Sequence, residues 1–102
     1  MAQAIGGRYG LPHGTLNGIC LPPALEWNEQ WAPDAVRRFR EAVGRDVAEL
    51  TALGGITRLR ELGVPEEDLS ELAAAAAARP GNQANPRPAT ASEIERLLRS
   101  VW

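Results

Sequence analysis

The most informative segment of this chain reads Leu11-Pro12-His13-Gly14-Thr15-Leu16-Asn17-Gly18-Ile19-Cys20-Leu21-Pro22, and Glu26-Trp27-Asn28 follows shortly after it. It contains His13, the only histidine of the sequence. A glycine-rich stretch precedes the segment and an apolar helical pattern follows. We therefore expect a helix that begins near Pro12 or His13, with the imidazole at its N-terminal end. A histidine there suits metal ligation or proton transfer, and a capping or packing role is the alternative on position alone.

Glycines and prolines indicate where helices should be interrupted. Gly6-Gly7 and Gly10 predict a turn at the start of the chain. Pro22-Pro23 predicts a kink or short break in the first long helix, because proline removes a backbone donor and clashes with the preceding turn. The segment 81–88 predicts a polar loop.

Five further helices are expected from hydrophobic spacing and end signals, over about 33–43, 46–53, 57–62, 65–78 and 90–102. The last has a capping box, with Thr90 at the cap and Glu93 three residues later. We find no convincing strand and no repeat. The sequence therefore predicts an all-α fold, a compact multi-helix bundle.

Length and charge limit the classes of protein that this chain can represent. Its 102 residues predict a single helical domain over 1–102. A net charge of −2 argues against binding to nucleic acid, which favours a basic face. Cys20 is the only cysteine, so no internal disulfide forms. No apolar run reaches membrane-spanning length, and we expect a soluble, cytoplasmic protein without membrane contact.

Two motifs of this chain follow a pattern found in one enzyme family. The first is Gln3-Ala4-Ile5-Gly6-Gly7-Arg8-Tyr9-Gly10-Leu11-Pro12-His13-Gly14, and the second is Asn85-Pro86-Arg87-Pro88 before the last helix. They resemble the motifs that open and close the C-terminal helical domain of the iron-containing alcohol dehydrogenases, in particular their maleylacetate reductase-like branch. The resemblance covers nearly the whole chain, and it implies the helical domain of a dehydroquinate synthase-like fold.

The resemblance assigns a role to His13. In that family a divalent metal, commonly iron or zinc, is held by an aspartate and three histidines, and His13 matches the last of these ligands. The other ligands precede the segment that this chain matches, and one imidazole cannot hold a catalytic metal alone. The family's NAD(P)-binding domain is likewise expected to be absent from 1–102. We therefore expect no tight binding of metal or NAD(P) by this chain by itself.

Three further residues are candidates for a substrate pocket. Family members usually carry a histidine ten positions before His13, where this chain has Gln3, which can orient a substrate but cannot shuttle protons. Asn17 lies about one helical turn from His13, and a surface contact is its alternative role. Arg87 is suited either to bind a substrate carboxylate through two hydrogen bonds or to tie its loop to a helix C-terminus.

The resemblance implies hydride transfer between NAD(P)H and a carbonyl or ene-carbonyl substrate. This chain would supply the helical domain with the metal and substrate sites, and its partner would be an N-terminal nucleotide-binding half or a further copy of itself. His13 would be a metal ligand or, in a metal-free reductase, a substrate-polarising group. The alternative is a stand-alone helical module without catalytic function, a split-enzyme subunit or a degenerate remnant. Whether the chain is an enzyme stays open, and alone we expect it to be catalytically incomplete.

Overall fold

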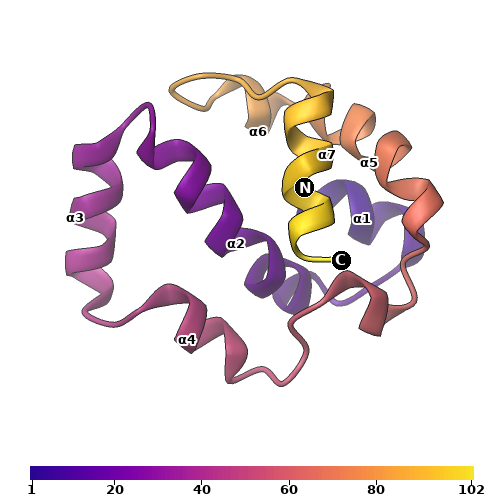
Figure 1. The fold of residues 1–102 in the computed structure, drawn as a ribbon, viewed down its shortest axis with the longest axis horizontal. Helices are drawn as coiled ribbons and strands as arrows, with labels where there is room; N and C mark the ends of the chain where they lie inside the picture. Colours follow the sequence, from indigo (N-terminus) through magenta and orange to yellow (C-terminus); the bar gives the residue numbers. More distant parts are fainter.

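The structure is a computed structural model that describes residues 1–102, and all of its regular elements are helices (Figure 1). The prediction of an all-α bundle is confirmed. In chain order the α-helices are α1 (Ala2–Tyr9), α2 (His13–Glu29), α3 (Pro33–Val43), α4 (Val47–Ala52), α5 (Leu69–Ala77), α6 (Pro80–Gln83) and α7 (Ala91–Ser100), with the 3₁₀ helices η1 (Leu59–Leu62) and η2 (Glu66–Asp68) between α4 and α5.

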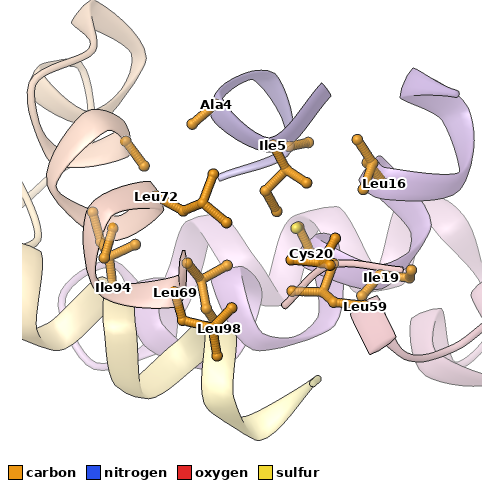
Figure 2. Close-up of a cluster of buried hydrophobic side chains, with 14 of the residues drawn as sticks. Ala4, Ile5, Leu16, Ile19, Cys20, Leu59, Leu69, Leu72, Ile94 and Leu98 are labelled. Atoms are coloured by element: carbon orange, nitrogen blue, oxygen red, sulfur yellow. The ribbon is translucent and has the colours of Figure 1, made fainter. Parts of the chain in front are cut away.

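The core lies where α1, α2, η1, α5 and α7 meet. Helices α5 and α7 pack along each other, and α1 contacts both α2 and α5 (Figure 1). The buried residues of α5 recur at the spacing of one helix face, and they are Leu69, Leu72, Ala73 and Ala76. Six large side chains in this core are less than 2% exposed (Figure 2), and they are Ile5, Leu16, Leu59, Leu69, Leu72 and Leu98.

Helices α3 and α4 contact α2 outside this core (Figure 1). Each of them buries one residue, Val36 in α3 and Val47 in α4, and neither belongs to the central cluster. Leu53, just beyond α4, is 77% exposed. Because little apolar area is buried there, these two helices contribute less to the stability of the fold than α5 and α7 do. No helix of the fold is both long and apolar enough to cross a bilayer.

The expected turn at Gly6-Gly7 is wrong, because both glycines lie inside α1. Only Gly10 ends the helix, with a left-handed φ of 66° and an N–H that donates to the Gly6 carbonyl. A glycine in a helix costs about 1 kcal/mol relative to alanine. The complete burial of Ile5, worth about 1.5–3 kcal/mol, offsets much of that cost.

Polar contacts also hold α1 against the start of α5. The Tyr9 hydroxyl donates a hydrogen bond to the Asp68 carboxylate. Arg8 pairs with the same carboxylate at 3.3 Å and with Glu71 at 2.7 Å. These three contacts join residues about sixty positions apart in the sequence, so the position of α1 depends on tertiary structure.

The expected break at Pro22-Pro23 is absent, since α2 runs without interruption from His13 to Glu29. Pro23 is itself buried, and Leu16, Ile19 and Cys20 are buried on the preceding two turns. Their burial holds the helix together although two backbone donors are missing. The short helix expected over 57–62 is present as the 3₁₀ helix η1. One other prediction needs correction, because the loop expected at 81–88 begins inside the short helix α6.

Gly6 is needed because α1 approaches α2 closely at this point. A Cβ at Gly6 would lie 3.3 Å from Cδ1 of the buried Leu16, whereas a Cβ at Gly7 would meet only Arg79 Nη2 at 3.8 Å. We expect Gly7→Ala to raise the free energy of unfolding by about 0.5–1 kcal/mol through helix propensity. Gly6→Ala should come out about 1–2 kcal/mol less stable than Gly7→Ala, because it overpacks the core. Urea unfolding of the two variants tests this, and equal stabilities would contradict it.

Candidate functional site

A cavity of about 600 Å³ opens between α1, α2, the end of α5, α6 and α7. Small-molecule sites have volumes of about 300–1,000 Å³, so the cavity has the size of a ligand pocket. Its apolar wall includes Leu21 and Trp27 of α2 and Ile94 and Leu97 of α7. Its polar lining residues are Gln3, His13, Asn17, Asn28, Arg79, Asn82 and Asn85.

Three of the four predicted site residues line this cavity together. His13 is the first residue of α2, and Asn17 lies one turn further along the same helix face. Gln3 comes from α1, which the packing of Gly6 brings against the start of α2. All three residues are exposed and make no side-chain hydrogen bond within the chain, so their polar groups are available to a ligand.

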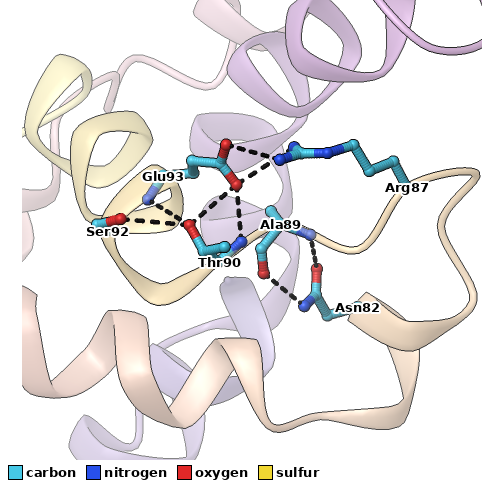
Figure 3. Close-up of polar contacts among 6 residues, drawn as sticks. All are labelled: Asn82, Arg87, Ala89, Thr90, Ser92 and Glu93. Carbon is cyan, nitrogen blue, oxygen red and sulfur yellow. Dashed lines mark hydrogen bonds and ion pairs between the residues drawn. The ribbon is translucent and has the colours of Figure 1, made fainter.

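Arg87, the fourth predicted residue, is not among the residues that line the cavity. Its Nη1 and Nη2 donate to the two carboxylate oxygens of Glu93 at 3.3 and 3.0 Å (Figure 3). Its guanidinium carbon lies 5.0 Å from the ring centroid of Trp27 and 4.6 Å from that of Trp31. Arg87 therefore ties its loop to the first turn of α7, not to a helix C-terminus, and its contact with substrate stays a prediction.

Glu93 also completes the capping box that the sequence predicts. Its carboxylate accepts from the Thr90 backbone N–H at 2.8 Å, and the Glu93 N–H donates to the Thr90 hydroxyl at 3.3 Å (Figure 3). The Arg87 hydrogen bonds, followed by that of Thr90, lower the pKa of Glu93 to about 2. The end of the loop is thus held by a carboxylate that stays ionised at neutral pH.

Asn82, which lines the cavity, holds the segment between α5 and α7 in place through its side-chain hydrogen bonds. Its Nδ2 donates to the carbonyls of Ala77 and Ala89 at 3.0 and 2.9 Å, and its Oδ1 accepts from the Ala89 N–H at 3.0 Å (Figure 3). These bonds join the end of α5 to the segment that precedes α7. We did not predict this role from the sequence, because an asparagine in a polar loop carries no signal for contacts with residues up to seven positions away.

Three side-chain polar atoms of the protein are buried without a hydrogen-bond partner, and they are Trp27 Nε1, Asn28 Oδ1 and Arg79 Nε. All three belong to residues that line the cavity. Leaving such a group unsatisfied costs about 1–3 kcal/mol. The unpartnered polar atoms of the protein are thus concentrated in the residues around this one cavity. The sequence carries no signal for any of the three, because burial without a partner is a property of the tertiary structure.

The titratable residues that line the cavity do not support a thiolate nucleophile or a metal site formed by this chain alone. Burial raises the pKa of the Cys20 thiol to about 11, so the group is a neutral thiol at pH 7 and not a thiolate nucleophile. No group of three or more His, Cys, Asp or Glu side chains in the chain is arranged to hold a metal ion. The donors of this chain therefore do not fit a metal by themselves, and His13 offers a single imidazole ligand.

Comparison with known proteins identifies relatives for the whole chain. Residues 1–102 match the family described as "Fe-containing alcohol dehydrogenase family, C-terminal". The chain is 36% identical to 4-hydroxybutyrate dehydrogenase from Cupriavidus necator, with 92% of the chain and 28% of that protein covered. It is 34% identical to maleylacetate reductase 1 from Rhodococcus opacus, with 100% of the chain and 30% of that protein covered.

A solved structure shows the same fold. The crystal structure of 1,3-propanediol oxidoreductase superposes with a TM-score of 0.86 at 24% sequence identity, over 99% of this chain and 31% of that one. The chain thus spans about three-tenths of the length of the curated relatives that it matches.

The ionised Glu93 predicts how stability depends on pH. Because its folded-state pKa is lowered to about 2 from its ordinary value of 4.5, its contribution to stability is present above pH 4.5 and is lost as pH falls toward 2. We expect the melting temperature of Glu93→Gln to lie below that of the wild type at pH 6, with the gap narrowing between pH 4.5 and 2. Glu67→Gln, at an exposed position without a hydrogen bond, is the matched control. A gap independent of pH would refute the assignment.

Proposed function

This chain belongs to the iron-containing alcohol dehydrogenase family as its C-terminal helical domain, and on that premise we propose that it forms the substrate-facing wall of an NAD(P)-dependent oxidoreductase. The proposed reaction is hydride transfer between NAD(P)H and a carbonyl or ene-carbonyl substrate. The observation that carries the proposal is the open cavity that gathers Gln3, His13 and Asn17 from two helices. The relatives are more than three times as long as this chain, which supports a nucleotide-binding half as its partner. A further copy of the chain is the second candidate partner.

The lining residues have separable tasks in this proposal. The His13 imidazole is one ligand of a divalent metal, iron or zinc, whose other ligands come from helices that precede the matched segment, or it hydrogen-bonds the substrate oxygen in a metal-free reductase. The side-chain amides of Gln3 and Asn17 hold polar groups of the substrate, since an amide both donates and accepts. Gln3 cannot carry a proton near neutral pH, so a proton relay through position 3 is not available.

The alternative, a helical module without catalytic function, predicts that the domain cannot complete an active enzyme. A chimera distinguishes the oxidoreductase hypothesis from the hypothesis of a non-catalytic module. In the chimera, this chain replaces the corresponding C-terminal segment of maleylacetate reductase 1 from Rhodococcus opacus. The alignment with that protein covers all of this chain. We expect the chimera to oxidise NADH in the presence of maleylacetate. A folded chimera that binds NADH but does not turn over would contradict the proposal.

His13→Ala in this chimera tests the role of the imidazole. We expect kcat/KM to fall by more than about 100-fold, because loss of even an outer-sphere partner of a metal site typically costs 10–100-fold. The matched control is Leu53→Ala, at a residue that is 77% exposed and does not line the cavity, and it should leave kcat/KM unchanged. The proposal fails for His13 if both variants turn over alike.

A further inference from the structure

Arg79 differs from every other basic residue of this protein. The chain has eleven basic residues, all arginines. Only two of them, Arg79 and Arg87, are half-buried, and Arg87 is paired with Glu93. Arg79 makes no ion pair and no side-chain hydrogen bond, and its Nε is buried without an acceptor. A guanidinium removed from water normally has a carboxylate or phosphate beside it.

The backbone holds Arg79 at a fixed place in the cavity wall. It lies between the end of α5 and the start of α6, with its N–H donating to the Ala76 carbonyl at 3.2 Å. Its carbonyl accepts from the Asn82 N–H at 3.0 Å. Its Nη2 would be 3.8 Å from a Cβ at Gly7, so the side chain extends from this junction to α1. The backbone of Arg79 is thus fixed at this junction, and its guanidinium lies near Gly7 of α1.

The charge of the cavity favours an anionic occupant. The protein has thirteen acidic residues, yet none of them lines this cavity. Besides the neutral amides of Gln3, Asn82 and Asn85, the lining includes Met1, whose N-terminal ammonium is close enough to Arg79 for the two positive charges to repel each other. An arginine in a wall without acidic groups attracts anions, and its planar fork of donors matches a carboxylate.

The same cavity offers further unpaired polar groups. The Trp27 indole N–H is a donor and the Asn28 Oδ1 is an acceptor, and both lack partners in the protein. Both atoms are themselves shielded from solvent, so they make the wall around Arg79 polar without being contact points for an occupant of the open cavity.

We propose that Arg79 is the carboxylate-binding residue of the cavity, and that the substrate is a small carboxylated carbonyl compound or hydroxy acid. This rests on the proposed function, because it takes the cavity as the place where substrate binds. Arg79 thereby takes the carboxylate-binding role that was one of the two alternatives for Arg87, whose donors face Glu93. In this arrangement Arg79 fixes the orientation of the substrate, and Gln3, His13 and Asn17 face the remainder of it.

A titration of this chain with succinate tests the proposal, using the Arg79 Nε–Hε resonance in ¹H–¹⁵N correlation spectra. Arg79→Gln assigns that resonance. We expect a saturable shift with succinate in the wild type, no shift with the uncharged succinamide, and at least tenfold weaker succinate binding in Arg79→Gln. The matched control is Arg45→Gln, at an exposed position that does not line the cavity, and it should bind succinate as the wild type does.

Arg79→Gln should melt at the same temperature as the wild type or higher, because it removes a buried donor that has no partner. A purely structural arginine would show the opposite, a lower melting temperature with unchanged succinate binding, and that result would overturn the proposal. Equal shifts with succinate and succinamide, or no saturable shift at Arg79, would overturn it as well. The titration needs neither nucleotide nor metal. Its result therefore tests anion binding at Arg79 independently of whether the chimera turns over.

Discussion

The candidate site depends on the packing of α1 against α2 and α5. Ile5 is completely buried in it, and Gly6 lets the two helix backbones approach over Leu16 (Figure 2). This contact brings Gln3 beside the start of α2, where His13 stands. If α1 were displaced, the core would lose an apolar side chain and the cavity would lose one of its walls. Stability and site geometry are therefore set by the same contact.

Two arginines from one loop region show how neighbours decide the role of a side chain. Arg87 is held by Glu93 and by two tryptophan rings, and so it is part of the scaffold that orients the segment before α7. Arg79 lies eight positions earlier and has no such partners. Both have the same charge and the same donors, yet one is satisfied by the protein and the other is left for an occupant of the cavity.

Much of the fold was predictable because helix ends are local features. The predicted capping box of Thr90 and Glu93 joins residues three positions apart and is confirmed, and the left-handed cap at Gly63 is equally local. The predictions at Gly6-Gly7 and Pro22-Pro23 were wrong for a common reason. Local propensity there opposes the helix, and burial of Ile5 and of the preceding turns of α2 outweighs it.

The sequence by itself determined the helical class, most helix ends, the family and the interest of His13, since these depend on composition, short-range spacing and one long motif. Only the tertiary structure decided which polar residues share a cavity. That cavity joins residues from Gln3 to Leu97, and their proximity follows from packing over long sequence separations. It also decided that Arg87 is paired and Arg79 is not, because burial and partnership depend on the neighbours that the fold supplies.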